Sequence, residues 1–451
     1  MGRLFWEAIQ RSTTGPIMAE EKFETELLPS VLASVQAKYK IEADPDEPVM
    51  ADPDMADAVF QAGMELLLEL GLYCQDTKRI IKFTEEEIKE AIATARHEVT
   101  FGQGRDEIRL TPRAPGDAKH PYCWPPAGTI TRDVDIYRAH ALTVVREPTC
   151  DGVFPLPLFG VGKTKNIAET PAHTLVCLTE ARIMNDVATW AGRPGLFFGI
   201  PMSATTPITL MSTFNSGLYN KYNCTLPVQI LMDMRVNYDR FNLTFFAEQQ
   251  GLEPWMSSSP TLYAYLTGPE QGAIEIIAHT LGMLAYSGGT LTQGMSVSVH
   301  GVYSGNDITW SNSAAALAAE QNLRLPWLTM GGTADPSGPM SDSSWYGTAV
   351  CIINACISGM EATWLSGGST GLEARWAGEL SRAAAALSPR EGIEIIKKAN
   401  AAECAPAPPA ATIDKLYDMS TLRPIPEFVD HYKKFTRIFK EWGLDYPSWD
   451  D

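Results

Sequence analysis

The feature that most constrains the fold is an alternation of short apolar runs with helical patterns, which extends from about residue 126 to residue 400. Such an alternation is typical of βα units, which build parallel sheets. Candidate strands lie at 127–131, 151–156, 195–200, 242–247, 256–262, 295–300, 326–331 and 362–366. Eight strands with intervening helices over about 270 residues fit an α/β fold of the (β/α)8, TIM-type barrel class. A doubly wound open sheet is the structural alternative.

Local signals divide the chain into three parts. Residues 1–125 form a predicted N-terminal helical extension and lid, 126–400 the barrel, and 401–451 a C-terminal helical tail. In the extension, one helix is predicted to begin at Asp52-Pro53-Asp54 and end at Gly71, and a second is predicted from the capping box at Thr84 through His97. The tail is helical from Pro426 and is expected to pack on the barrel or on a neighbouring subunit.

Charge and hydropathy narrow the class of protein. The chain has 36 basic and 54 acidic residues and a net charge of -18, which argues against binding to nucleic acid. No apolar run approaches the roughly 20 residues that span a bilayer, and the N-terminus lacks a signal-peptide pattern. We therefore expect a cytoplasmic protein that binds no membrane. The eight cysteines contain no Cys-x-x-Cys pair, as in proteins with reduced thiols.

Glycines with polar or aromatic residues follow several predicted strands, where a barrel would bring them to one mouth. They occur at 255–265, 296–301, 327–335 and 364–371. A further stretch, from Trp190 to Met202, reads as a helix end, a Pro and Gly break, and a buried strand. The active site of a barrel forms at the carboxyl ends of its strands, so these segments are the candidates.

Several of these segments carry a resemblance to a known family. They include Leu66 to Thr77, Arg79 to Ile88, Gly102-Gln-Gly-Arg-Asp106, Ala191-Gly-Arg-Pro-Gly195, and Thr370-Gly-Leu-Glu-Ala-Arg375 with Gly378-Glu379. Together they are similar to the monomethylamine methyltransferase family of methanogens, in colinear order over nearly the whole chain. The resemblance implies a (β/α)8 barrel, assembled as a homo-oligomer, that moves a methyl group from a small methylated substrate to cobalt. That cobalt belongs to the corrinoid (cobalamin) of a partner protein docked over the barrel mouth, and no tightly bound cofactor is expected.

One position departs from the family. Counting from Gly195, the family's pyrrolysine falls on Gly199, and a glycine offers no side chain to form an adduct with an amine. The counterparts of the family's acidic residues fall at Cys224 and Ser257, and that of its glutamine near Pro326. The resemblance therefore implies a non-pyrrolysine methyltransferase whose donor differs from monomethylamine.

The remaining residues suggest how such a donor would be held. Methyl transfer to cobalt(I) is a displacement in which the protein positions the methyl group and assists the leaving group. A quaternary ammonium needs no such assistance and binds to aromatic faces, although aromatic residues at strand ends also simply close a core. The substrate-binding candidates, with Trp124 as a further member of the aromatic set, are Phe197, Phe198, Gly199, Tyr222, Cys224, Trp255, Ser257, Tyr263, Tyr265 and Trp327.

Catalytic assistance is predicted at two residues. His300 shares a strand face with Ser296 and Ser298, and Asp335 follows a later strand, so both are candidate proton donors, or else a packed histidine and a turn aspartate. A zinc site would need several ligands at one mouth, and Cys224 alone does not make one, so no metal is predicted. Two alternatives stay open: demethylation of a methoxyl or methylthio compound by the same corrinoid route, and a non-catalytic binding protein on the same barrel.

Overall fold

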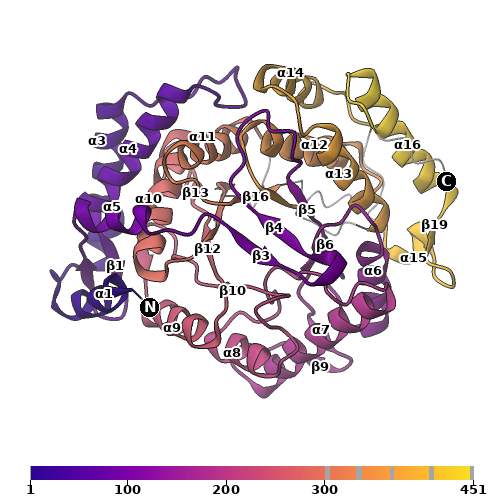
Figure 1. Cartoon of the computed structure of the whole chain (residues 1–451), viewed down its shortest axis with the longest axis horizontal. Helices are drawn as coiled ribbons and strands as arrows, with labels where there is room; N and C mark the ends of the chain where they lie inside the picture. Colours follow the sequence, from indigo (N-terminus) through magenta and orange to yellow (C-terminus); the bar gives the residue numbers. More distant parts are fainter. Residues whose placement is uncertain (1, 300–304, 332–337, 366–369, 406–410, 447–451) are drawn as a thin grey trace.

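The chain forms a closed barrel of eight parallel segments surrounded by helices, as viewed along the barrel axis in Figure 1. The computed structural model describes residues 2–299, 305–331, 338–365, 370–405 and 411–446. In order, the barrel segments are β5 (Tyr122–Trp124) continued by β6 (Pro126–Ala127), β7 (Phe154–Pro155), the segment 196–199, β10 (Leu226–Pro227), β12 (Pro254–Ser258), β14 (Leu291–Gly294), β16 (Trp327–Gly331) and β17 (Ala362–Leu365). The predicted TIM-type fold is thus confirmed, and the open sheet is wrong.

Backbone hydrogen bonds close the ring. Six strands pair in the order β10-β12-β14-β16-β17-β5, and β6 pairs in parallel with β7. The segment 196–199 bridges the gap: Val153 N–H donates to the Phe197 carbonyl at 2.9 Å, and Thr225 N–H donates to the Gly199 carbonyl at 2.8 Å. Each barrel segment is therefore paired with a neighbour on both sides within the described residues.

One helix follows each barrel segment. In chain order the helices are α6 (Val134–Val145), α7 (Pro171–Trp190), α8 (Pro207–Asn215), α9 (Tyr238–Gln250), α10 (Pro269–Ser287), α11 (Asn306–Asn322), α12 (Asp342–Ile357) and α13 (Gly371–Ala383). α7 and α10 begin at Pro171 and Pro269, where proline suits the first helical position because it has no N–H to leave unpaired.

The sequence-based strand assignments differ from the structure at several barrel segments. The predicted strand 242–247 lies inside α9, which the Asn237 side chain caps at its start and Gly251, with φ of 62°, ends. Conversely, β5 and β10 lie in segments that were not predicted as strands. In the case of β5, the neighbouring Pro121, Pro125 and Pro126 are typical of a loop. A proline has no N–H to donate, but its carbonyl can still accept a hydrogen bond from a neighbouring strand. Here Phe154 N–H donates to the Pro125 carbonyl.

Short helices and a two-stranded hairpin precede the barrel. The elements are α1 (Arg3–Thr14), α2 (Glu20–Lys22), the π-helical turn η1 (Phe23–Leu27), α3 (Leu28–Tyr39), α4 (Pro53–Leu70), β1 (Leu72–Cys74), β2 (Arg79–Ile81), α5 (Glu85–Ala93), β3 (Val99–Phe101), the 3-10 turn η2 (Gly104–Asp106) and β4 (Ile108–Leu110). α4 packs on α10 so closely that a Cβ at Gly63 would lie 2.6 Å from Ile277. The predicted capping box of Thr84 and Glu87 is present, although α5 ends at Ala93 rather than at His97.

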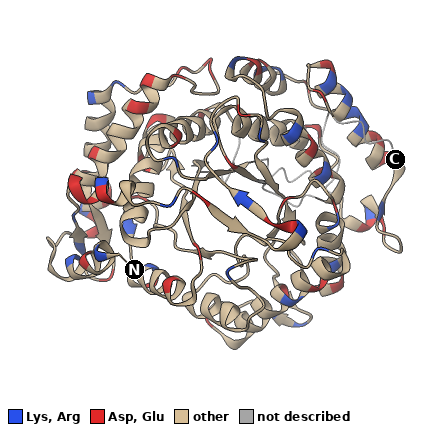
Figure 2. Ribbon diagram, viewed as in Figure 1, with Lys and Arg blue, Asp and Glu red and all other residues tan. Residues whose placement is uncertain are grey.

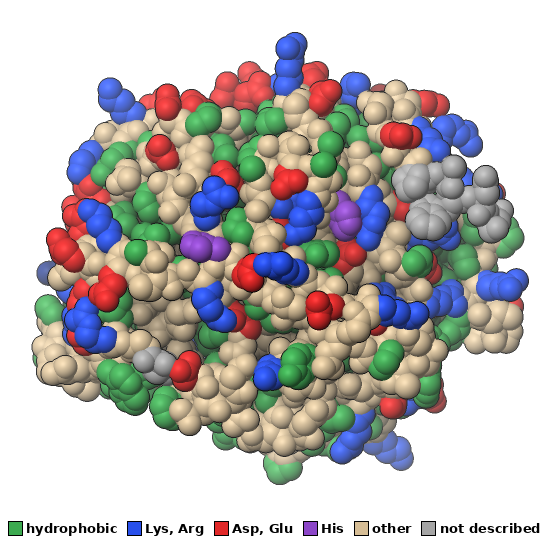
Figure 3. Space-filling view, in the orientation of Figure 1, with side chains coloured by type: hydrophobic (Ala, Val, Ile, Leu, Met, Phe, Trp, Pro, Cys, Tyr) green, Lys and Arg blue, Asp and Glu red, His purple; other side chains and the backbone are tan. Residues whose placement is uncertain are grey.

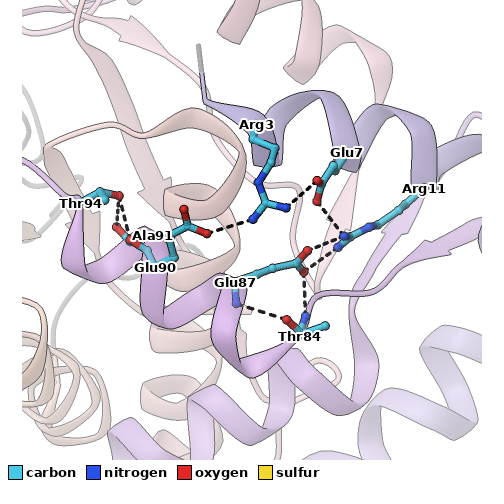
Figure 4. A network of polar contacts seen from close by, with 8 residues as sticks. All are labelled: Arg3, Glu7, Arg11, Thr84, Glu87, Glu90, Ala91 and Thr94. Atoms are coloured by element: carbon cyan, nitrogen blue, oxygen red, sulfur yellow. Dashed lines mark hydrogen bonds and ion pairs between the residues drawn. The ribbon is translucent and has the colours of Figure 1, made fainter.

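A polar network joins α1 to α5 (Figure 4). Arg11 donates from both terminal nitrogens to the Glu87 carboxylate, and Arg3 binds Glu7 and Glu90. The hydrogen bonds from Arg11 lower the pKa of Glu87 to about 2. Charge pairing therefore fastens the first helix to the extension.

The β3–β4 hairpin lies across one end of the barrel (Figure 1). Its Gly102 N–H donates to the Tyr222 carbonyl, its Gln103 N–H donates to the Gly195 carbonyl, and Phe101 stacks on Phe197 at 4.4 Å. Tyr222 and Gly195 both precede their barrel segments. The hairpin thus closes the amino end of the barrel, opposite the mouth.

The C-terminal elements pack on the same barrel. They are α14 (Pro389–Asn400), α15 (Ile413–Leu416), β18 (Tyr417–Asp418), β19 (Arg423–Pro424) and α16 (Pro426–Glu441). Phe435 and Phe439 of α16 contact Trp345 and Trp376 of α12 and α13, with Phe435 stacked on Trp345 at 5.2 Å. The tail is therefore an outer layer of this barrel.

Charged residues lie mainly on the outer helices (Figure 2). On the hairpin face, acidic and basic side chains are interspersed (Figure 3). Within the described ranges, no helix combines the length and apolar character needed to span a membrane.

Candidate active site

The segment 196–199 ends at Gly199, the residue on which the sequence resemblance places the family's pyrrolysine. Gly199 has φ of 61°, in the left-handed region that favours glycine. A Cβ built on Gly199 would lie 2.5 Å from Cε1 of Phe154, a ring of the barrel interior. The space that a side chain at residue 199 would enter is therefore filled by Phe154.

Below Gly199, aromatic rings fill the barrel. Phe154 lies 5.2 Å from Trp255, and Trp124 lies 5.0 Å from Phe197 and 6.2 Å from Trp255, measured between ring centroids. All four side chains are fully buried. Because these rings are fully buried and contact one another, the cluster is a packed core layer rather than an open cage.

Polar side chains of the inner face lie next to the aromatic layer. Oε1 of Gln293 accepts hydrogen bonds from Trp255 Nε1 at 3.0 Å and Ser257 Oγ at 3.1 Å, and Nε2 contacts Met295 Sδ at 3.3 Å. On the neighbouring segment, Thr225 Oγ1 donates to the Gly199 carbonyl at 2.8 Å. These groups hold one another in place, and none of them carries a charge.

The predicted substrate-binding residues of the barrel wall do not all face the same way. Phe197, Gly199, Trp255 and Ser257 lie on the inner face of the barrel wall. Phe198, Cys224 and Trp327 lie on the outer face, packed among the surrounding helices. Cys224 is fully buried there, which raises the pKa of its thiol. In the part of the chain that the structure describes, no three His, Cys, Asp or Glu residues are grouped to hold a metal ion.

Tyr222 lies at the other end of the barrel. It is exposed beside Lys221, whose ammonium nitrogen is 5.1 Å from the Tyr222 ring, and both line a cavity of about 760 Å³ next to the hairpin. This cavity opens at the amino ends of the strands, so it is separate from the mouth. The structure does not bring Tyr222 together with the inner-face residues.

Two predicted tyrosines are at the mouth. Tyr263 and Tyr265 follow β12 and are exposed, and the Tyr263 hydroxyl donates to Asp307 at the start of α11. This hydrogen bond is the main reason that the pKa of Tyr263 is raised to about 12. The candidate proton donors His300 and Asp335 lie outside the described residues.

Three mouth residues were missed from the sequence. Phe154 falls in a predicted strand, but nothing in the sequence places its ring against Gly199. Gln293 was overlooked because its strand was predicted to begin at residue 295, whereas β14 begins at Leu291. Thr225 lies beside Cys224, and strand alternation would have identified it had β10 been recognised.

The family-like segments at the amino end of the barrel contact one another. Arg193 Nε lies 2.7 Å from Asp106 Oδ1, and a Cβ at Gly195 would lie 2.1 Å from the Gln103 carbonyl oxygen. These contacts join the hairpin to the segment that leads to Gly199. In the family-like segment that begins at Thr370, Glu373 caps α13 and Arg375 pairs with Glu379 at 3.0 Å.

Comparison with known proteins identifies the family. The profile of monomethylamine methyltransferase MtmB matches residues 4–444. The chain belongs to the monomethylamine methyltransferase family. MtmB1 of Methanosarcina acetivorans is 26% identical over 460 residues, covering 97% of this chain and 98% of that protein. MtmB of Methanosarcina mazei is likewise 26% identical over 463 residues, with the same coverage.

Solved structures agree with this fold. The crystal structure of the Methanosarcina barkeri monomethylamine methyltransferase superposes with a TM-score of 0.87 and 22% identity, covering 98% of each chain. The structure of a hydroxylamine complex of MtmB gives the same values. As a member of the monomethylamine methyltransferase family, the protein is a corrinoid-dependent methyltransferase.

Proposed function

We propose that this family member uses no pyrrolysine and transfers a methyl group from a small methylated amine, in particular a quaternary ammonium compound, to the cobalt of a corrinoid protein. The observation that carries the proposal is the contact between Gly199 and Phe154. Gly199 has no side chain, and the Phe154 ring occupies the place where one would project. Covalent capture of an amine at this position is therefore unavailable to the protein.

The chemistry of the inner face favours a donor that needs no proton. In the displacement, the cobalt(I) electron pair forms the cobalt–carbon bond while the carbon–nitrogen bond breaks, and the nitrogen leaves with the bonding electrons. A quaternary ammonium then departs as a neutral amine, whereas a methoxyl group needs a proton or a Lewis acid. The polar groups Ser257, Gln293 and Thr225 and the thioethers Met295 and Met330, all described on this face, are neither acids nor bases.

The surface around the mouth fits a protein partner. Eight of the fifteen large apolar side chains exposed among the described residues follow six successive barrel segments, seven of them in loops and Ile208 in the first turn of α8. We call them the mouth rim: Ile130, Phe159, Ile167, Ile208, Met232, Tyr263, Tyr265 and Val299. Exposed apolar side chains gathered on one face of a protein are typical of a protein-binding surface. The rim supports docking of the corrinoid protein over the mouth.

The experiment supplies cobalt(I) cobalamin with one donor at a time and follows the absorbance change from cobalt(I) to methylcobalt(III). The donors are monomethylamine, dimethylamine, trimethylamine, tetramethylammonium, a betaine, a methoxyaromatic compound and a thioether. We expect methylation with a quaternary donor and none with monomethylamine. Turnover of methoxyl or thioether donors alone would overturn the choice of an amine, and no turnover with any donor, even when the corrinoid protein is present, would favour a binding protein.

A further inference from the structure

A second set of residues, outside the barrel wall, is built around the mouth segment 200–206. This segment follows Gly199 and leads into α8. Its central residue is Ser203, which is 1% exposed and directly contacts two residues of α7, Glu180 and His173. None of these three residues was a sequence-based site candidate.

Glu180 accepts hydrogen bonds from both donors of Ser203. Its Oε2 accepts from Ser203 N–H at 2.9 Å and from the Ser203 hydroxyl, and its Oε1 accepts from the Tyr219 hydroxyl at 3.3 Å. Glu180 is 1% exposed, and burial raises its pKa to about 8 against the effect of these three donors. Burial of a carboxyl group costs free energy, and the three hydrogen bonds that Glu180 accepts offset part of this cost.

His173 holds the carbonyl of the same serine. Its Nδ1 accepts from Glu169 N–H at 3.3 Å, which leaves Nε2 to donate to the Ser203 carbonyl at 2.8 Å. The histidine is buried, and its two ring nitrogens therefore have defined roles as acceptor and donor. Ser203 is thus held at its N–H, its hydroxyl and its carbonyl.

Ser203 also connects the mouth loops that follow two successive barrel segments. Its Oγ accepts from Leu158 N–H at 3.0 Å, and Leu158 follows β7, the strand that carries Phe154. The hydroxyl thereby accepts a hydrogen bond from the Leu158 amide while it donates one to Glu180. The two loops flank the Gly199–Phe154 contact, so their spacing depends on this chain of hydrogen bonds.

We infer that Glu180 is a positioning residue: by fixing Ser203, it sets the path of residues 200–206 and the distance between the two mouth loops that receive the methyl donor. This inference rests on the proposed function, because it takes the mouth as the donor site. Glu180 lies outside the barrel wall and acts through Ser203.

The test compares three variants with a matched control. Glu180→Leu removes the acceptor, and Glu180→Gln keeps one acceptor oxygen for Ser203 N–H. Ser203→Ala breaks the link to Leu158 while leaving the carboxyl group. The control is Glu253→Gln, another buried glutamate that accepts a backbone N–H, that of Thr290, but at the amino end of the barrel.

Hydrogen–deuterium exchange of each full-length variant measures the segment directly. We expect faster exchange of peptides that cover 157–159 and 200–206 in Glu180→Leu and Ser203→Ala, a smaller change in Glu180→Gln, and none in Glu253→Gln. Unchanged exchange of these peptides in both Glu180→Leu and Ser203→Ala would overturn the inference. This measurement needs no substrate, so it stands even if no donor is turned over and the proposed function fails.

Steady-state kinetics with the active donor gives the functional readout. We expect Glu180→Leu to raise the KM for the donor about tenfold. Glu180→Gln should restore most of this loss, and Glu253→Gln should leave KM unchanged even where it lowers the melting temperature. An equal rise of KM in Glu253→Gln would show a general loss of stability and would overturn the positioning role.

Discussion

Replacing Gly199 with alanine tests the contact on which the proposed donor site depends. A Cβ at this position meets two obstacles: φ of 61° and the Phe154 ring carbon at 2.5 Å. The left-handed conformation costs about 1–2 kcal/mol for a residue other than glycine, and overpacking a buried site costs about 1–3 kcal/mol. We therefore expect Gly199→Ala to lower the free energy of unfolding by about 2–5 kcal/mol.

Gly251 supplies the control that separates these two costs. It has φ of 62° and no atom within 4 Å of a built Cβ, so Gly251→Ala carries the conformational cost alone. Denaturant unfolding of both variants, followed by circular dichroism, compares their midpoints at equal m-values. The larger loss in Gly199→Ala measures the clash with Phe154.

A double-mutant cycle with Phe154→Ala completes the test. Phe154→Ala alone should destabilise by about 3–5 kcal/mol because it leaves a cavity. With the ring removed, Gly199→Ala should cost about the same as Gly251→Ala, which gives a coupling energy of about 1–3 kcal/mol between the two sites. Additive effects, or equal losses in Gly199→Ala and Gly251→Ala, would refute the claim that Phe154 fills the space beside Gly199.

Three further outcomes follow from the structure. Gln293→Leu leaves the Trp255 indole N–H and the Ser257 hydroxyl without an acceptor. We expect the free energy of unfolding to fall by about 1–3 kcal/mol and the methyl donor to bind more weakly. An unchanged KM for the donor would exclude Gln293 and Ser257 from the donor site. Arg11→Met removes the donors that lower the pKa of Glu87 to about 2. The wild type should therefore be more stable to unfolding than Arg11→Met above about pH 4.5, and this difference should disappear as the pH falls toward 2. A difference in unfolding midpoint that does not change with pH would contradict this. Phe159→Asp on the mouth rim should slow methylation of the corrinoid protein more than tenfold while leaving methylation of free cobalamin unchanged, and equal slowing of both reactions would rule out a docking role.

The parts of the fold that were predicted from sequence depend on local signals. Prolines at helix starts and the Thr84–Glu87 capping box act within a few residues, so the sequence alone identifies them. The barrel segments are harder, since several are only two or three residues long and their pairing depends on distant neighbours. Residues 242–247 show the limit: a run rich in phenylalanine reads as a strand, while Asn237 and Gly251 place it in a helix.

The candidate site was predicted less completely than the fold. Whether a strand residue faces the barrel interior or the surrounding helices depends on the register of that strand. Phe197 faces the barrel interior and Phe198 faces the helices, although the sequence gives no reason to prefer either. The same applies to Trp327 and Leu328 in β16. A shift of one residue in a strand exchanges the two faces, so a list of aromatic residues cannot specify a binding cage until the register is known.

The two ends of the barrel show how a clear family relationship is compatible with the change of donor that we propose. The Arg193–Asp106 pair and the close approach of Gly195 to Gln103 hold the hairpin against the amino end, where they govern folding. The donor contacts that we propose belong to the opposite end, where Gly199, Phe154 and Gln293 lie. Barrel stability and barrel chemistry reside on different faces of such folds, so substitutions at the mouth change the substrate while the closing contacts keep the scaffold. Variants of the Arg193–Asp106 pair should therefore lower stability without changing which donor reacts, whereas variants around Gly199 should change the choice of donor.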